Sequence, residues 1–177
     1  MPAMPIAAAL LLMQQAPPEN VDWEEVFGVE EVAADPVTGE LPVDPYVADN
    51  ANAGADPFAS GKMAELFGGQ EGIRAITDRL VAINLSDPRI AAIFESHDLV
   101  RLRRTLFEQF CYILNAGCDY TGRDMHASHA KLGIQKGDMN ALVENLQMAM
   151  READVPFSAQ NRLLAKLAPM SPDIIER

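Results

Sequence analysis

The segment "DLVRLRRTLFEQFCYIL" (residues 98–114) decides the fold class of this chain. Its apolar side chains recur at spacings of three and four residues, which is the period of one face of an α-helix. They are Leu99, Leu102, Leu106, Phe110 and Ile113. We therefore expect one stripe of this helix to face a core, with the charged residues between them largely outside.

The helical period continues on both sides of this segment. From Lys62 onward no alternating run is long enough to propose a β-sheet, and Pro, Gly and Asn mark the breaks between helices. The sequence thus predicts an all-α domain over residues 62–177. The expected helices cover residues 70–85, 88–94, 98–114, 123–132, 137–153 and 155–170.

Residues 1–61 have a different composition. They contain 11 of the 26 acidic residues and no Lys or Arg, so they carry -11 of the net charge of -12. They also contain 8 of the 12 prolines. Such a segment rarely packs, and we expect an extended, acidic N-terminal extension. The low overall pI argues against nucleic acid or an anionic membrane surface as the main partner.

Two stretches stand out in the extension. "IAAALLLM" (residues 6–13) is too short to span a membrane but fits the core of an export signal within residues 1–16. No basic residue precedes it, so periplasmic or exported and cytoplasmic locations both stay open. "VDWEEVFGVEEV" (residues 21–32) is either an acidic spacer or a short amphipathic segment that orders on a reductase or another protein partner.

The stretch "DMHASHAKLGI" (residues 124–134) contains two of the three histidines. At 100° per residue, His129 shares an inward face with Met125 and Leu132, whereas His126 lies on the boundary toward solvent. A neutral imidazole in an apolar space ligates a transition metal or haem iron, but the same pattern fits a core histidine bonded to a carbonyl. Zinc would need further ligands, and none has a recognised spacing. The candidates are Cys111, Cys118, Asp124 and His97.

Several features together resemble a group 1 truncated haemoglobin. They are the glycine pair Gly68–Gly69, "DPRI" (87–90), Phe94, "YTGRDM" (120–125) and the histidine four residues after Met125. They occur in the family's order and spacing, and the likeness runs from about Met63 to the C-terminus without evident insertion or deletion. The resemblance implies a truncated globin fold, a two-over-two helical sandwich around haem b.

The resemblance also implies roles for individual residues. His129 corresponds to the proximal iron ligand, bound through Nε2, with Nδ1–H donating to a backbone carbonyl. Phe94 corresponds to the phenylalanine that stacks on the porphyrin, and His126 to a neighbour without a required role. The other expected haem-pocket residues are Val81, Leu102, Leu106, Phe110, Tyr120 and Met125. Tyr120 and four bases form the pool for haem propionates: Arg101, Arg104, Arg123 and Lys131.

The distal side departs from the family pattern. Many members have a tyrosine where Val81 stands and polar groups at the positions of Leu102 and Leu106. A charged-type hydrogen bond to bound O2 contributes roughly 1.5 to 3 kcal/mol, so an apolar wall favours faster loss of O2. We therefore expect a reversible binder of O2, NO or CO rather than an oxygen store. Gln109 and His97 are either solvated or candidate distal partners.

Two other functions stay open at this point. One is a haem redox enzyme such as an NO dioxygenase, which the missing distal donors make less favourable. The other is a haem-free helical interaction module that keeps a globin frame. The two cysteines, Cys111 and Cys118, are beyond disulfide reach in a continuous helix, but the turn "NAGC" (residues 115–118) can fold the second one back. A disulfide and two free thiols are both compatible with this sequence.

Overall fold

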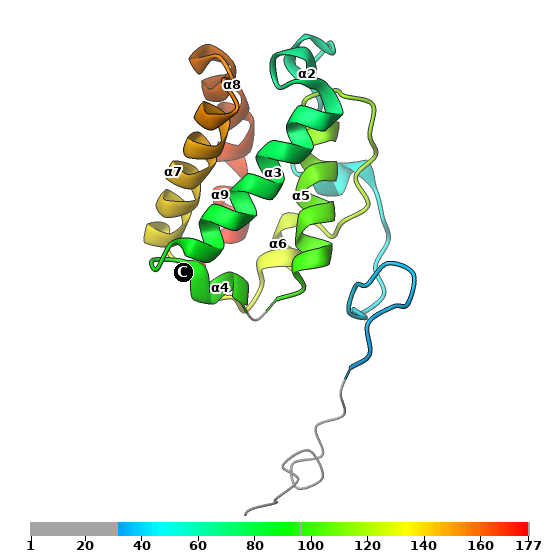
Figure 1. Cartoon of the computed structure of the whole chain (residues 1–177). Helices are drawn as coiled ribbons and strands as arrows, with labels where there is room; N and C mark the ends of the chain where they lie inside the picture. Colours follow the sequence, from blue (N-terminus) through cyan, green and yellow to red (C-terminus); the bar gives the residue numbers. More distant parts are fainter. Residues whose placement is uncertain (1–31, 96, 177) are drawn as a thin grey trace, which may run out of the picture. The chain divides into compact units, whose positions relative to one another are not determined.

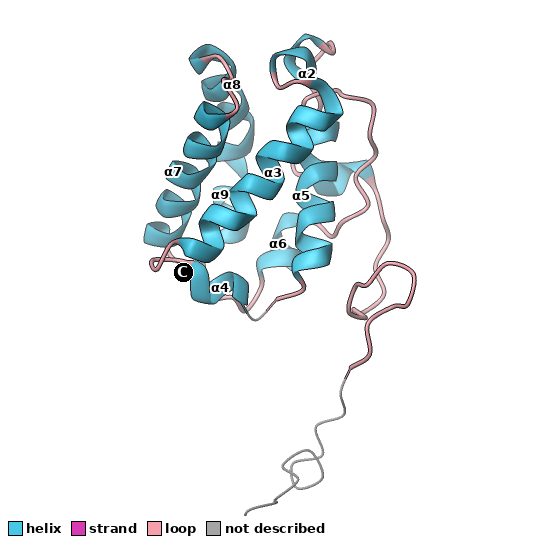
Figure 2. Ribbon diagram, in the orientation of Figure 1, coloured by secondary structure: helices cyan, strands magenta, loops and turns pink. Residues whose placement is uncertain are grey.

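The computed structural model describes residues 32–95 and 97–176. The expected export signal at residues 1–16 and nearly all of the acidic stretch at 21–32 lie outside them. The chain divides into two units, Met1–Val32 and Ala33–Arg177, and the second is described by itself. Within the described ranges every regular element is a helix, as the sequence predicts (Figure 2). The elements are η1 (Asn50–Ala53), α2 (Lys62–Leu66), α3 (Gly69–Ser86), α4 (Ala91–Glu95), α5 (Leu99–Ile113), α6 (Met125–His129), α7 (Lys136–Glu152), α8 (Phe157–Leu167), η2 (Ala168–Met170) and α9 (Ser171–Ile174).

Helix α3 is the centre of the arrangement. It packs against α5 on one side and α7 on the other, and α4 follows it at its C-terminal end (Figure 1). Helices α7 and α8 form a second packed pair. None of the helices in the described part of the chain is long and apolar enough to cross a membrane.

The glycine pair between α2 and α3 has a backbone reason. Gly68 and Gly69 have φ values of 77° and 65°, in the left-handed region that side chains with a Cβ rarely adopt. Two such residues in succession turn the chain sharply at the start of α3. The turn lets Met63 and Phe67 of the preceding segment reach the core, where both are buried.

The main core consists mainly of side chains from α2, α3, α5, α7 and α8, with Ala53, Tyr120, Met125, Val155 and Met170 added from the segments between and beside them. Its largest fully buried members include Met63, Ile73, Ile113, Met150 and Leu163. The apolar stripes of three and four residues that the sequence shows therefore do face inward. Helix α5 contributes Phe110 and Ile113 to this core from its C-terminal half.

Residues 40–53, which we call the strap, belong to the same compact unit as the helices. Glu40 is buried and pairs with both Arg101 and Arg104 on the outer face of α5. Further along, the Tyr46 hydroxyl donates to the carbonyl of Thr121 at 2.8 Å. At its end Ala53 is fully buried in the main core. The strap thus covers charges that the sequence places on the outside of α5.

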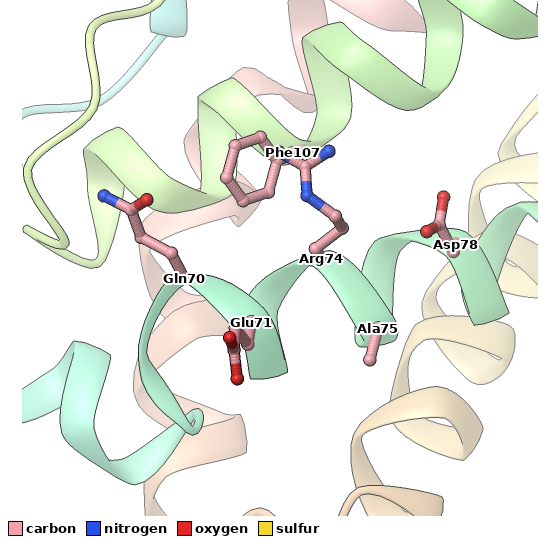
Figure 3. Close-up of a pocket in the computed structure, with 6 residues that line it drawn as sticks. All are labelled: Gln70, Glu71, Arg74, Ala75, Asp78 and Phe107. Carbon is pink, nitrogen blue, oxygen red and sulfur yellow. The ribbon is translucent and has the colours of Figure 1, made fainter.

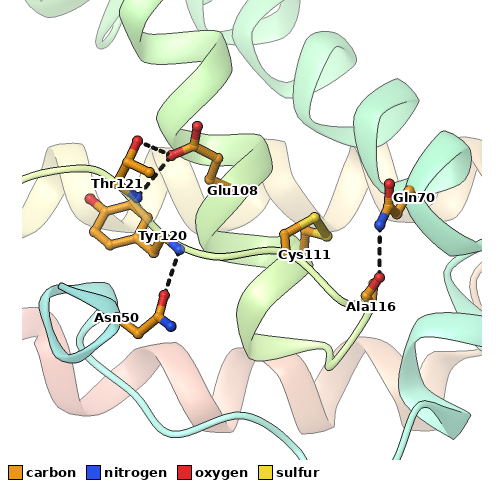
Figure 4. Close-up of a disulfide and its surroundings, with 8 residues drawn as sticks. Asn50, Gln70, Glu108, Cys111, Ala116, Tyr120 and Thr121 are labelled. Carbon is orange, nitrogen blue, oxygen red and sulfur yellow. Dashed lines mark hydrogen bonds between the residues drawn. A yellow bond between two sulfur atoms is a disulfide. The ribbon is translucent and has the colours of Figure 1, made fainter. Parts of the chain in front are cut away.

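A disulfide joins Cys111 of α5 to Cys118 in the following loop, with 5.6 Å between their α-carbons. The turn after α5 therefore folds the chain back, which is one of the two states that the sequence leaves open. Figure 4 shows the hydrogen bonds that hold the same loop. They join Gln70 to the carbonyl of Ala116, the backbone N–H of Tyr120 to Asn50, and Thr121 to Glu108.

Candidate functional site

Helix α6 positions His129. The Asp124 carboxylate caps the helix by accepting from the N–H of Ala127 at 2.8 Å, and the helix ends at His129, earlier than the expected Leu132. The imidazole Nδ1 lies 2.7 Å from the carbonyl oxygen of Met125. Because a carbonyl can only accept, Nδ1 carries the proton and the lone pair of Nε2 is left for another partner. Burial lowers the pKa of His129, against the opposing effect of the Met125 carbonyl, so the ring is neutral near pH 7.

The other polar candidates are placed differently. His126, on the same helix, and His97 are both exposed. Gln109 is buried, and its Nε2 donates to the carbonyl of Ala53 at 2.9 Å. Gln109 therefore anchors the strap rather than lying in solvent.

Several apolar side chains lie outside the main core cluster, and we call them the second apolar region. Four buried residues, Val81, Ile90, Ile134 and Ala141, do not belong to the main cluster. With them we group Phe94, Leu102, Leu106 and His129, which are half-buried although three of them are large and apolar. Figure 1 shows the supporting segments gathered at one end of the helical domain. These segments are the C-terminal half of α3, helix α4, the N-terminal half of α5, helix α6 and the start of α7.

Three of the predicted pocket residues belong to the main core cluster. Phe110, Met125 and Tyr120 are buried there among other core side chains. The Tyr120 hydroxyl donates to the carbonyl of Arg123 at 2.9 Å, and burial raises the pKa of Tyr120 to about 12. The predicted set is therefore split, with five of its eight residues in the second apolar region and three in the main core.

Most of the basic residues considered as propionate partners face the strap. Arg101 and Arg104 pair with Glu40, and Arg104 also pairs with Glu108 at 3.0 Å. Arg123 donates to the carbonyl of Asp44 and lies over the Tyr46 ring. Lys131, just after α6, is exposed.

Two buried polar residues on α3 were missed by the sequence analysis. Thr77 and Asn84 are fully buried, and they share one helical stripe with Val81 because the three positions are spaced by four and three residues. The Thr77 hydroxyl donates to the carbonyl of Arg74 at 2.9 Å. Asn84 contacts Asn145 of α7, with 3.0 Å between its Oδ1 and the Asn145 Nδ2. Their positions on the same helical face as Val81 could have indicated from the sequence that both polar side chains are buried.

A groove of about 390 Å³ lies elsewhere, between the first half of α3 and the second half of α5. Figure 3 shows its lining, with the Arg74 guanidinium over the Phe107 ring at 3.6 Å from the ring centre. Glu71 and Asp78 add charge to the lining. The groove contains none of the predicted haem residues, and its charged walls do not suit a porphyrin.

The second apolar region fits haem better than a bare metal ion. No group of three or more His, Cys, Asp or Glu side chains in residues 32–95 and 97–176 is placed to hold a metal. The disulfide also removes both cysteines as ligands. Haem iron needs only one protein ligand on one side, in apolar surroundings, and a neutral histidine with a carbonyl-bound Nδ1 suits it.

Comparisons with known proteins identify the family of the helical domain. The family model of the bacterial-like globins matches residues 62–176. Group 1 truncated hemoglobin GlbN of Mycolicibacterium paratuberculosis is 26% identical over 108 residues, covering 61% of this chain and 79% of the relative. The GlbN protein of Nostoc commune is 31% identical over 87 residues, covering 48% of this chain and 74% of the relative.

Solved structures show the same fold. The truncated hemoglobin of Tetrahymena pyriformis matches with a TM-score of 0.62 and 20% identity, covering 65% of this chain and 98% of its own. The 2/2 hemoglobin of Synechococcus sp. PCC 7002 matches with a TM-score of 0.60 and 19% identity over similar shares, 65% and 98%. These matches confirm the predicted two-over-two helical sandwich. The chain therefore belongs to the bacterial-like globin family, as a haem-binding group 1 truncated haemoglobin whose cofactor is haem b.

Proposed function

We propose that His129 binds haem iron through Nε2 and that the domain reversibly binds a diatomic gas, O2, NO or CO. The observation that carries this proposal is the state of His129. Its Nδ1 proton is committed to the Met125 carbonyl at 2.7 Å, which leaves the Nε2 lone pair for iron. His126 and His97, in contrast, are both exposed.

Haem supplies the iron that binds the gas, whereas the protein supplies ligation, orientation and the polarity of the surroundings. The Met125 carbonyl fixes the plane of the imidazole and makes Nε2 a stronger electron donor. Phe94, half-buried on α4, is the proposed stacking partner of the porphyrin. Half-buried apolar side chains would gain hydrophobic free energy when the porphyrin covers them, roughly 25 cal/mol per Å² of apolar surface.

The gas pocket is proposed to be mostly apolar. Val81, Leu102 and Leu106 carry no hydrogen-bond donor in their side chains, and Gln109 is held by the Ala53 carbonyl. O2 gains more from a donor than CO or NO does, so this wall favours ligand exchange over storage of O2. A reversible binder or sensor of diatomic gases is the function that these surroundings support.

We also propose that residues 62–177 form the haem-binding domain and that the acidic extension, residues 1–61, contacts a reductase or another protein. The support is the charge of the extension, which has 11 acidic residues and no basic one. Removing residues 1–31 should then slow reduction of the iron by a basic reductase without changing the absorption spectrum. An unchanged rate of reduction would exclude this role for the removed residues.

Absorption spectra of the ferric, ferrous and CO-bound protein test the haem site directly. His129→Ala should abolish or strongly alter the Soret band, because it removes the only proposed protein ligand. His126→Ala is the matched control, since it changes an exposed histidine of the same helix and should leave the spectrum unchanged. If His129→Ala keeps the spectrum of the unaltered protein, the assignment of His129 fails.

A further inference from the structure

The side-chain nitrogen of Asn84 is buried but has no hydrogen-bond partner. Two buried side-chain nitrogens among the described residues lack a hydrogen-bond partner, Asn84 Nδ2 and Arg101 Nε. Arg101 Nε still lies 3.5 Å from the Asp98 carboxylate in an ion pair. Asn84 is 0% exposed. Leaving such an amide group unpaired costs about 1 to 3 kcal/mol, so a buried one calls for an explanation.

A chain of contacts determines which way this amide faces. The Asp87 carboxylate can only accept, and Asn145 Nδ2 donates to it at 3.0 Å. The same nitrogen donates to Asn84 Oδ1, also at 3.0 Å. Rotating the Asn84 amide by 180° would bring two donors together. The Asp87 carboxylate therefore sets the orientation of Asn145, which sets that of Asn84 and leaves Asn84 Nδ2 as an oriented donor.

The Asp87 carboxylate, the first group in this series of hydrogen bonds, is held by an ion pair. Arg89 donates to the Asp87 carboxylate, with 2.7 Å between Nη2 and Oδ2. The Arg89 guanidinium keeps the pKa of Asp87 well below its usual range, and the Asn145 amide adds to this effect. Asp87 is consequently ionised at neutral pH and remains an acceptor. The orientation of Asn84 does not depend on pH in the physiological range.

The position of Asn84 on α3 connects it to the proposed gas pocket. Thr77, Val81 and Asn84 form one fully buried stripe, and side chains three or four residues apart on a helix lie about 5–6 Å apart at their β-carbons. The Thr77 hydroxyl already donates its hydrogen bond to the carbonyl of Arg74. Asn84 is thus the only member of the stripe with a donor to spare.

We propose that Asn84 supplies the hydrogen-bond donor of the gas pocket, acting on a ligand oxygen directly or through one water, and that Asn145 and Asp87 position it. This inference rests on the proposed function, because it takes Val81 as part of the pocket wall. It adds a polar group to a wall that is otherwise apolar at Val81, Leu102 and Leu106. O2, which accepts hydrogen bonds more strongly than CO, is the ligand that gains from it.

The test compares haem-loaded Asn84→Leu with the unaltered protein. Removing the donor should speed dissociation of O2 about tenfold, the effect of one hydrogen bond of about 1.4 kcal/mol. It should also shift the C–O stretching band of the CO complex to higher frequency. The denaturant midpoint of the holoprotein should fall, because the variant also removes the Oδ1 atom that accepts from Asn145 Nδ2. If Asn84→Leu does not fold, Asn84→Val gives the same readouts with a smaller side chain.

Thr77→Val is the matched control. It removes a buried hydroxyl from the same stripe, and that hydroxyl already donates to the carbonyl of Arg74. It should leave the C–O band and the O2 dissociation rate unchanged. Asn145→Leu removes the anchor but keeps the donor, and it should split or broaden the C–O band as the amide rotates. A single unshifted band in that variant would refute the positioning role of Asn145.

Two results would overturn the inference. An O2 dissociation rate and C–O band unchanged in Asn84→Leu would mean that the Asn84 amide does not reach the ligand. Equal changes in Asn84→Leu and Thr77→Val would mean general repacking. Either result leaves the proposed function standing if His129→Ala abolishes the Soret band. If the unaltered protein has no Soret band, both the proposed function and the role of Asn84 are refuted.

Discussion

The main core and the second apolar region use the same kinds of side chain but are filled to different degrees. Ile73, Ile113 and Leu163 in the main core are all 0% exposed. Phe94 and Leu106 in the second region are equally apolar, yet they are only half-buried. Protein interiors are normally packed to the density of organic crystals. The chain alone therefore buries the side chains of the main core, whereas it leaves large apolar side chains of the second region partly exposed.

Helix α5 contributes to both regions through one continuous stripe. Phe110 and Ile113, near its C-terminal end, are buried in the main core, while Leu102 and Leu106, nearer its start, are half-buried in the second region. The same period of three and four residues thus serves two purposes. The difference arises from what lies opposite each half of the helix, and substitutions on this one stripe can test it.

Truncation to alanine on α5 gives the largest expected contrast. Ile113→Ala should lower the free energy of unfolding by about 2 to 5 kcal/mol, because it leaves a cavity in a filled core. Leu106→Ala should cost less than about 1.5 kcal/mol in the haem-free protein, where its site is not fully packed. Urea unfolding of both haem-free variants measures the two costs. Equal costs would show that the second region is packed as tightly as the core.

The disulfide gives a second contrast, because it joins α5 to the loop on the side of the main core. Replacing both Cys111 and Cys118 with alanine should lower the free energy of unfolding by about 2 to 3 kcal/mol through the lost constraint on the unfolded chain. The hydrogen bond from Gln70 to the Ala116 carbonyl and the one from the Tyr120 N–H to Asn50 would still hold the loop (Figure 4). We expect the Soret band to stay in place. A shifted Soret band would show that the two regions are coupled through this loop.

Helical periodicity was enough to predict the all-α class and most of the helices, because each amphipathic stripe is a local pattern. The resemblance pointed to His129, and the structure leaves that residue half-buried while His126 is exposed, as their helical angles predict. Periodicity could not separate Phe110 from Leu106, since both lie on one stripe. Which of them meets the core depends on elements that are distant in sequence.

The strap is the feature that local patterns could least predict. Glu40 and Arg104 are 64 residues apart, and the composition of residues 1–61 is typical of segments that do not pack. A buried carboxylate between two guanidinium groups compensates for the missing apolar side chains at that point. Asn84 was missed for a related reason: its partner Asn145 lies on another helix, 61 residues away.

Glu40→Gln tests how much the strap stabilises the outer face of α5. The Arg104 guanidinium, helped by the charge of Arg101, lowers the pKa of Glu40 below its ordinary 4.5. The variant should lose about 1.5 to 3 kcal/mol at pH 7, as expected for hydrogen bonds to a charged group. Because the folded-state pKa is the lower one, this contribution is full above pH 4.5 and disappears as the pH falls below that value.

Denaturation at several pH values measures this contribution. Glu152→Gln is the matched control, because Glu152 forms an exposed pair with Arg79 that should contribute little to stability. The difference between Glu40→Gln and the unaltered protein should shrink on acidification. A difference that stays constant down to pH 3 would mean that the charge of Glu40 does not stabilise the strap.

The smallest expected effect comes from adding a donor to the second region. Leu106→Gln puts an amide on the wall of the proposed gas pocket, and one hydrogen bond of about 1.4 kcal/mol should slow dissociation of O2 about tenfold. Stability should change little, because a half-buried position lets the amide reach water. Leu106→Met is the control for shape, since it keeps the volume without a donor. If both variants slow the dissociation of O2 to the same extent, the added side-chain shape and not the hydrogen bond retains the ligand. The second region would then differ from the main core only in how completely its side chains are buried.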